Sequence, residues 1–169
     1  IPKNINIYKD NKYLSKITNS QSVALCIRSN RFTEKSGKIE EKDRKNSEIF
    51  VAEQIQYIRK AISFFKKTLD KPVFFLWSNN LKELPNEFSF EKIIHINNND
   101  IPNKKDKILC DFFLMTNCKH YAVTPSSFNW WGCWLSKSKN SIVVRPNDNY
   151  FSNISIKNKD YWPNSWKVI

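Results

Sequence analysis

Four short polar segments of this 169-residue chain begin where apolar runs stop, and their composition suits a phosphorylated ligand. The segments are residues 28–31, 78–80, 95–99 and 124–128. Arg28 carries a guanidinium, which stays charged at any working pH and can clamp a diphosphate with two parallel hydrogen bonds. From its position alone, a surface ion pair with a nearby acid explains Arg28 slightly better.

The segment from Thr124 to Phe128 is the most informative of the four, because it leads from an apolar run into the start of a helix. Free backbone N–H groups and the positive end of the helix dipole form an anion site there without a glycine-rich loop. The hydroxyls of Ser126 and Ser127 add hydrogen-bond donors. An ordinary helix cap explains the same residues equally well, so spacing leaves both interpretations open.

Asp111 stands in an otherwise apolar helical stretch. Its carboxylate could accept two hydrogen bonds from the N–H edge of guanine, or it could simply face water. The tryptophan-rich stretch 130–134 suits sugar stacking or a buried helix face, and we favour the core. Gly132 is predicted to let this helix approach a neighbour closely. His95 and His120 lie in strand patterns and are predicted to be packed structural histidines.

The four cysteines contain no C-x-x-C pair and are predicted to be reduced and buried. They are Cys26, Cys110, Cys118 and Cys133. A zinc site from Cys110, Cys118 and His120 is an alternative, but its spacing matches no structural type. We therefore predict no metal site.

Composition excludes several classes of protein. Hydrophobic residues make up 40% and aromatic residues 14%, which is too much for a disordered chain. Two glycines are too few for a collagen-like chain or a phosphate loop built from several glycines. The longest apolar run, Val73–Trp77, is a strand's length and no membrane helix. The net charge of +12 comes mostly from dispersed lysines, which disfavours a nucleic-acid binder with a contiguous basic face.

Strands and helices are predicted to alternate along the chain. Strands are expected at 22–28, 72–77, 92–96, 120–124 and 141–145, and helices at 47–69, 106–118 and from Ser126 to about Leu135. The strands are continuous apolar runs, which is typical of a parallel sheet covered on both faces. The fold class is therefore α/β, an open, doubly wound, mostly parallel sheet with helices on both faces.

Two helical faces are predicted to be buried. In the long helix the face is Val51, Ile55, Ile58, Ile62, Phe65 and Leu69, with Asn46 or Ser47 as the cap. In the last helix it is Phe128, Trp131, Trp134 and Leu135. Ligands of such sheets bind outside the carboxyl ends of the strands, so the four polar segments are expected to meet at one edge.

Two parts of the chain are expected. Residues 1–21 have no clear period and are predicted to be a connecting segment, a remnant of a preceding domain, and 22–169 the ligand-binding domain. The chain begins with Ile1 rather than Met, so we expect that sequence precedes it.

The residues also resemble a known family. SFNWWGCWLSKSKNSIVVRP (127–146) is very similar to the S-F-S-W-W-G-A-W-L block of bacterial α-1,2-fucosyltransferases, glycosyltransferase family 11. DFFLMTNCKHYAVTPSS (111–127), VFFLWSNN (73–80) and YWPNSWKVI (161–169) resemble further family blocks less specifically. SVALCIRSNRF (22–32) stands where the family has its H-x-R-R-G-D-Y signature.

The resemblance implies the Rossmann-like, carboxyl-terminal lobe of a GT-B glycosyltransferase, which binds GDP-fucose. Arg28 would pair with the donor β-phosphate and stabilise the departing GDP. Ser126, Ser127 and the Phe128 amide would hold the pyrophosphate, and Asp111 would read guanine. Ser78 and Asn79 would line the nucleotide pocket. The amino-terminal lobe, which shapes the acceptor site, is expected outside this chain.

The chain departs from the family signature at several donor-side positions. The signature His, second Arg, Gly and Asp are replaced by Cys26, Ser29, Asn30 and Arg31, and the paired acids after the second strand by Asn79 and Asn80. We hypothesise that Arg31 restores the lost positive charge.

The expected activity is transfer of fucose from GDP-fucose to a glycan hydroxyl, with inversion and without a metal or other cofactor. Glu34 and His95 are the general-base candidates. The alternative is a donor-binding or degenerate fragment that binds a nucleotide sugar or glycan without catalysis. The expected partners are the nucleotide sugar and the acceptor, with no nucleic acid and at most peripheral membrane association. The expected location is the cytoplasm or the cytoplasmic face of a membrane.

Overall fold

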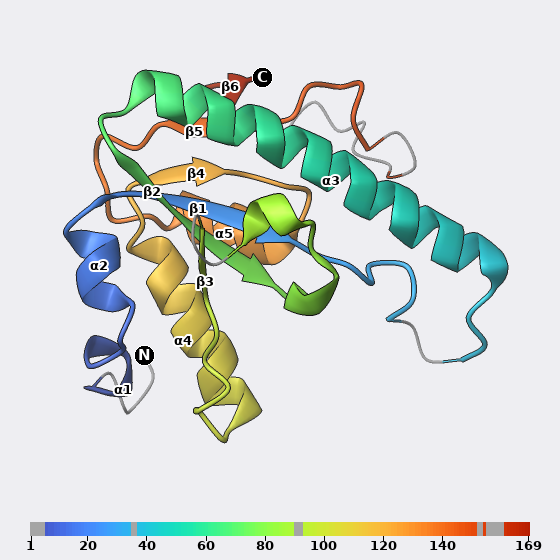
Figure 1. Cartoon of the computed structure of the whole chain (residues 1–169), viewed down its shortest axis with the longest axis horizontal. Coiled ribbons are helices and arrows are strands. Elements are labelled where there is room, and N and C mark those ends of the chain that lie inside the picture. Colours follow the sequence, from blue (N-terminus) through green and yellow to red (C-terminus); the bar gives the residue numbers. More distant parts are fainter. Residues whose placement is uncertain (1–5, 35–36, 90–92, 152–153, 155–160) are drawn as a thin grey trace.

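A computed structural model describes residues 6–34, 37–89, 93–151, 154 and 161–169 (Figure 1). Its helices are α1 (Asn6–Lys9), α2 (Leu14–Thr18), α3 (Glu41–Thr68), α4 (Lys104–Thr116) and α5 (Ser127–Trp134), with 3₁₀ turns at Leu81–Glu83 and Asn86–Phe88. Its strands are β1 (Gln21–Ile27), β2 (Pro72–Ser78), β3 (Ile94–His95), β4 (His120–Ala122), β5 (Val143–Arg145) and β6 (Lys167–Val168). These elements form one six-stranded sheet with helices packed against it.

The strands lie in the order β3-β2-β1-β4-β5-β6, and every neighbouring pair is parallel. β1 pairs with β2 along its whole length, from Gln21 opposite Pro72 to Ile27 opposite Ser78. On its other side β1 pairs with β4. The chain order therefore reverses between β1 and β4, which is the switch point where open parallel sheets bind ligands.

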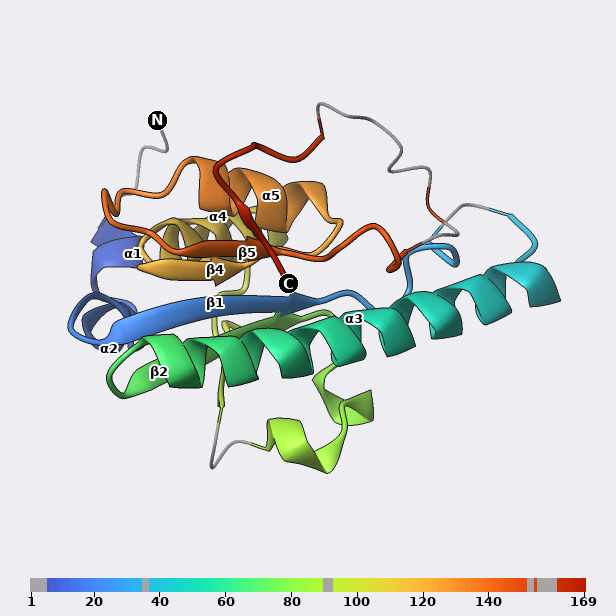
Figure 2. The ribbon, with the colours of Figure 1, turned by 90° about the horizontal axis from the view of Figure 1, so that it is seen from above.

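Helices cover both faces of the sheet, as Figure 2 shows. α3 packs on one face, where Tyr57, Ile58 and Phe65 join the side chains of β1 and β2. α4 and α5 lie on the other face, and Tyr8 and Ile17 of the first two helices are buried there with them. Because apolar residues of β1 are buried on both faces, its sequence reads as a continuous apolar run. The predicted α/β architecture is confirmed.

The long helix begins earlier than predicted. α3 starts at Glu41 with Glu40 as its cap, so the predicted start at Asn46 or Ser47 is wrong. The Glu40 N–H donates to the Asp43 carboxylate at 3.1 Å, which completes a capping box. The charged first turns need no apolar contact, so hydrophobic spacing does not detect them.

The buried faces of α3 and α5 also differ from the prediction. α3 buries Phe50, Gln54, Tyr57, Ile58, Ala61 and Phe65, whereas Val51, Ile55, Ile62 and Leu69 are half-buried. α5 buries Asn129, Gly132 and Cys133, and leaves Trp131, Trp134 and Leu135 about half exposed. The predicted core role therefore fails for two of the tryptophans, whereas the half-buried Trp130 packs against Trp166.

Gly132 brings α5 into close contact with α4, as predicted. A Cβ atom at this position would lie 2.5 Å from Met115 Sδ and 2.9 Å from Met115 Cγ. Glycine in a helix normally costs stability relative to alanine. The close approach gives the physical reason for this glycine.

We predict that Gly132→Ala destabilises the fold. Overpacking costs about 1–3 kcal/mol, and this should exceed the gain of about 1 kcal/mol in helix propensity. Urea unfolding would measure the change in unfolding free energy. In a Met115→Ala background the same substitution should cost much less, because the clashing atoms are gone. An equal cost in both backgrounds would contradict the proposed contact.

Candidate functional site

The carboxyl ends of β1 and β4 are joined at the switch point by a buried threonine. Thr124 Oγ1 donates to the carbonyl of Cys26 at 3.2 Å, and the Thr124 N–H donates to Asn129 Oδ1 at 2.7 Å. These bonds hold the α5 turn, residues 124–128, against the end of β1. Thr124 itself is fully buried, so its role here is structural.

Arg31 lies against the α5 turn. Its Nη1 donates to the carbonyl of Pro125 at 2.8 Å, and its guanidinium lies 5.4 Å from the centre of the Phe50 ring. Partial burial lowers the pKa of Arg31, and the positive charge of Arg28 adds to that lowering. A guanidinium has five N–H donors, so the bond to Pro125 leaves others for a ligand.

Arg28 follows β1 directly, and a buried glutamine fixes its backbone. The Arg28 N–H donates to Gln54 Oε1 at 3.0 Å, and Gln54 Nε2 donates back to the Arg28 carbonyl at 2.9 Å. The Arg28 side chain pairs with Glu34, and both side chains are partly exposed. Gln54 was not predicted as a site residue. Its one signal in the sequence is that it places a polar amide on the sheet-facing side of an amphipathic helix.

The serines of the α5 turn are placed differently. Ser126 caps α5 and is buried, but its hydroxyl makes no capping bond, and its N–H donates to the Thr124 carbonyl at 2.7 Å. Ser127 is exposed and Phe128 is half-buried. Their N–H groups belong to the first turn of α5, where a helix offers no acceptor. The amides of Ser127 and Phe128 are therefore the donors that this turn can present to an anion.

Asn79 ties the end of β2 to the segment that follows β1. Its Oδ1 accepts from the Ser29 N–H at 2.9 Å, and its Nδ2 donates to the side chain of Asn30. Three of the departures from the family signature therefore contact one another. A carboxylate at position 79 could not donate to Asn30. Ser78 Oγ accepts from the Asn80 N–H at 3.1 Å, so it shapes the same edge.

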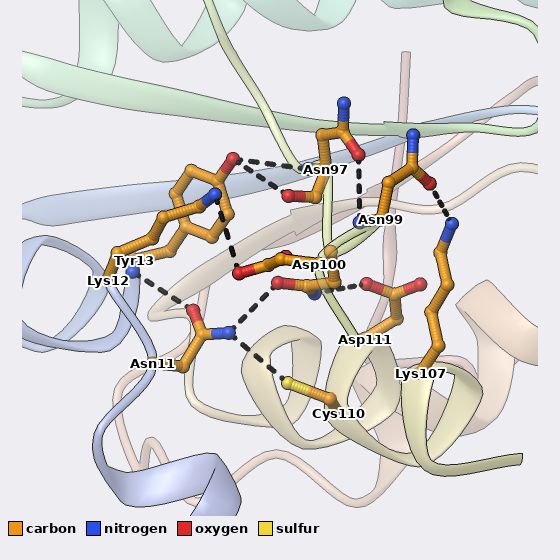
Figure 3. Close-up of polar contacts among 10 residues, drawn as sticks. Asn11, Lys12, Tyr13, Asn97, Asn99, Asp100, Lys107, Cys110 and Asp111 are labelled. Atoms are coloured by element: carbon orange, nitrogen blue, oxygen red, sulfur yellow. Dashed lines mark hydrogen bonds and ion pairs between the residues drawn. The ribbon is translucent and has the colours of Figure 1, made fainter. Parts of the chain in front are cut away.

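Asp111 lies in α4 on the second face of the sheet, where it is half-buried. Its Oδ1 accepts a hydrogen bond of 2.6 Å from Asn98 Nδ2. Burial raises the pKa of Asp111, while the Asn98 bond and the charge of Lys107 oppose that rise. Figure 3 shows Asp111 and Lys107 side by side on α4. Its carboxylate can still accept further hydrogen bonds, because each oxygen has two lone pairs.

Cys26 connects the surroundings of Asp111 and Arg28. Burial raises the pKa of this thiol to about 12, with Arg28 lowering it and Asp111 raising it further. Both charged groups therefore act on one side chain at the end of β1.

Tyr161 is a further group near Arg31 that the sequence analysis did not select. Its carbonyl accepts from Trp130 Nε1 at 2.9 Å, which ties the carboxyl-terminal segment to α5. Burial raises the pKa of its phenol, and the charge of Arg31 opposes that rise. The only signal for Tyr161 in the sequence is its place in the last block, 161–169, that resembles the family.

The structure also places the remaining candidates. His95 and His120 are buried and hydrogen-bonded, His95 to the Phe88 carbonyl and His120 to Gln21, as predicted for structural histidines. All four cysteines are free and buried. Among the described residues no group of three or more metal-ligating side chains comes together, and no helix is long and apolar enough to cross a membrane.

A pocket of about 400 Å³ opens beside the end of β3. Its walls are Lys12, Tyr13, Ile94, His95, Asn97, Asn99 and Asp100. It therefore lies next to the loop that carries Asn98, at the side of the sheet away from β4.

The sequence model of "Glycosyl transferase family 11" matches residues 10–169. The chain belongs to this family. It is similar to the O-antigen biosynthesis glycosyltransferase WbnK of Escherichia coli, with 29% identity over 111 residues, or 65% of this chain and 36% of the relative. It is also similar to an α-1,2-colitosyltransferase of Escherichia coli, with 29% identity over 118 residues, or 66% of this chain and 37% of the relative.

The family 11 chain thus aligns with little more than a third of the length of these curated relatives. No solved structure matches it significantly. The family assignment confirms the resemblance to glycosyltransferase family 11.

Proposed function

We propose that this chain is the donor-binding lobe of a fucosyltransferase-like enzyme. The reaction is transfer of fucose from GDP-fucose to a glycan hydroxyl, with inversion at C1 and without a metal ion. The observation that carries the proposal is the Arg31–Pro125 hydrogen bond. It brings the basic segment after β1 to the N-terminus of α5, at the switch point of a parallel sheet.

In this proposal the acceptor oxygen attacks C1 of the sugar, and the bond from C1 to the β-phosphate oxygen breaks. The bonding electrons leave with GDP, and the hydroxyl proton passes to a base. Negative charge grows on the β-phosphate, and stabilising this charge is the main catalytic task of the chain. Arg28, Arg31 and the amides of Ser127 and Phe128 supply fixed donors for it.

Neither predicted base candidate is free in the structure. Glu34 pairs with Arg28, and His95 is buried against the Phe88 carbonyl. We therefore assign the chain to donor binding and leave the base unassigned. In this proposal Ser78 and Asn79 line the nucleotide pocket, and their hydrogen bonds hold the backbone at the end of β2 in place.

The relatives offer a choice of sugar. The name of the second relative specifies colitose rather than fucose. The sugar is joined to the far end of the diphosphate from the base, so its identity has to be tested separately. GDP-fucose and the corresponding colitose donor should be compared in the assay. The nucleotide part of the proposal is the same for either sugar.

Calorimetric titration with GDP, UDP and ADP tests the proposal. We expect GDP to bind most tightly and its affinity to be unchanged by EDTA. A Kd that is equal for the three nucleotides, or binding that requires a metal, would contradict it. GDP-fucose binding without transfer when an acceptor-binding lobe is supplied would favour the alternative of a non-catalytic binder.

We predict that Glu34→Gln tightens GDP binding. Glu34 occupies the Arg28 guanidinium, so it competes with a phosphate for the same donors. The pair is partly exposed, and such pairs are worth at most about 1 kcal/mol, so the expected gain in affinity is about 2- to 5-fold. Glu41→Gln is a matched control, because Glu41 pairs with Lys45 on the exposed start of α3. Weaker GDP binding by Glu34→Gln would instead assign Glu34 a direct role.

A further inference from the structure

Asn98 is a fully buried side chain whose amide is bonded at both ends. Its Nδ2 donates to Asp111 Oδ1 at 2.6 Å, and its Oδ1 accepts from Asn11 Nδ2 at 2.9 Å. An ionised carboxylate can only accept hydrogen bonds, so the nitrogen of Asn98 must face Asp111. The Asn98 side-chain oxygen then faces Asn11, whose Nδ2 donates to it. The orientation of the Asn98 amide is thereby determined from two sides.

Residues 11–13 brace the loop that carries Asn98 (Figure 3). The Tyr13 hydroxyl donates to the Asn97 carbonyl and accepts from the Asn97 N–H, both at 3.2 Å. Lys12 Nζ lies 3.9 Å from Asp100 Oδ2. Together with the Asn11–Asn98 bond, these contacts hold successive positions of the loop to the segment between α1 and α2.

The Asp111 carboxylate is held through one of its oxygens. Oδ1 receives the Asn98 bond, and among the described residues no hydrogen bond reaches Oδ2. Burial acts against the charged form of Asp111, and the Asn98 bond favours it. A carboxylate that is ionised and fixed in orientation can present two oxygens to a pair of N–H groups on a base.

We propose that Asn98, held in place by Asn11, is a positioning residue that directs the Asp111 carboxylate toward the N1–H and 2-amino groups of guanine. This inference rests on the proposed function, in which Asp111 reads the base. It adds that base selectivity depends on residues that do not touch the nucleotide. The segment between α1 and α2, on the other side of the loop, thus contributes to the choice of donor.

The test is the ratio of the Kd values for IDP and GDP, measured by calorimetry on the whole chain. IDP lacks the 2-amino group but has the same phosphates, so the ratio isolates that contact. We expect wild type to prefer GDP and Asn98→Ala to lower this preference about 5- to 10-fold. Asn11→Ala keeps the buried Asn98 amide but removes the bond that fixes its orientation. It should therefore also lower the preference for GDP over IDP, by a smaller factor than Asn98→Ala.

Asn97→Ala is the matched control, because it keeps the backbone bonds of Asn97 to Tyr13, and the exposed Asn97 side chain bonds the Asn99 N–H rather than Asp111. Its preference for GDP should equal that of wild type. If Asn98→Ala does not fold, the ratio measured for Asn11→Ala tests the positioning role. Folded variants that keep the wild-type ratio would overturn the positioning role while leaving the proposed function intact. Wild type that binds GDP and IDP equally would also overturn it, whereas wild type that binds no GDP would overturn the proposed function itself.

Discussion

Replacing Arg28 with alanine should slow sugar transfer about 100- to 1000-fold, the usual loss when one fixed donor to a developing anion is removed. The negative charge that develops on the departing GDP would then no longer be stabilised by the Arg28 guanidinium. Arg28 stands at the end of β1, where Gln54 hydrogen-bonds its backbone N–H and carbonyl. Arg31→Ala should act in the same direction, since its guanidinium lies at the α5 turn. Steady-state kinetics of transfer, measured with an acceptor-binding lobe supplied, and GDP affinity by calorimetry on the chain itself, measure both effects.

Two controls make this prediction specific. Arg59→Ala removes the same charge from an exposed position in the middle of α3 and should leave transfer and GDP affinity unchanged. Arg28→Lys keeps the charge but loses the planar fork of donors, so it should recover only part of the activity. Unchanged turnover and GDP affinity in Arg28→Ala would refute the proposed role of Arg28.

The affinity for GDP relative to UDP should fall on acidification, and Asp111→Asn should remove this GDP-specific dependence, whereas protonation of the terminal phosphate weakens both nucleotides alike. Only the ionised carboxylate accepts both N–H groups of guanine. Burial raises the pKa of Asp111, so the loss should begin at a higher pH than for an exposed aspartate. Above that pKa the ratio of the GDP and UDP affinities should be constant. Asp111→Asn should bind GDP about 10- to 100-fold more weakly at neutral pH, as expected for a lost hydrogen bond to a charged group.

Calorimetry between neutral pH and the lowest pH at which the chain stays folded would give this profile, with circular dichroism defining that limit. UDP is the internal control, because its base cannot make the same contact while its phosphates respond equally to Arg28 and Arg31. If Asp111→Asn shows the same decline as wild type, another group is responsible. The base-reading role of Asp111 would then be rejected.

The sheet was predictable from the sequence because its strands are buried on both faces. Continuous apolar runs at β1 and β2, and shorter runs at β4 and β5, carry that information directly. β6 escaped prediction because its two residues, Lys167 and Val168, are exposed and pair with β5 only through the backbone. The start of α3 escaped for a similar reason, since its first turns are charged and make no core contact.

The helix faces were harder to predict, because tertiary contacts decide which of two neighbouring stripes is buried. In α3, Tyr57 packs in the core with β1 and β2, and its hydroxyl tolerates burial because it donates to the Val144 carbonyl at 2.8 Å. Phe50 is buried because it packs against Phe151, with ring centres 5.3 Å apart. In α5 the close approach at Gly132 turns Trp131 and Trp134 toward solvent. None of these partners is near in sequence.

The candidate site was partly predictable for a different reason. Parallel strands bring their carboxyl ends to one edge, so the segments after β1 and β4 had to be neighbours. The side-chain pairings at that edge were not predictable. Arg28 pairs with Glu34, Arg31 contacts Pro125, and Gln54 and Asn98 fix their neighbours from within the core. Each depends on the exact course of a loop.

The most direct test of the account is a crystal structure of the chain with GDP bound. We predict that the diphosphate lies between the guanidinium groups of Arg28 and Arg31 and the amides of Ser127 and Phe128, with guanine at Asp111. GDP seated in the pocket beside β3, with its phosphates out of reach of both arginines, would contradict it.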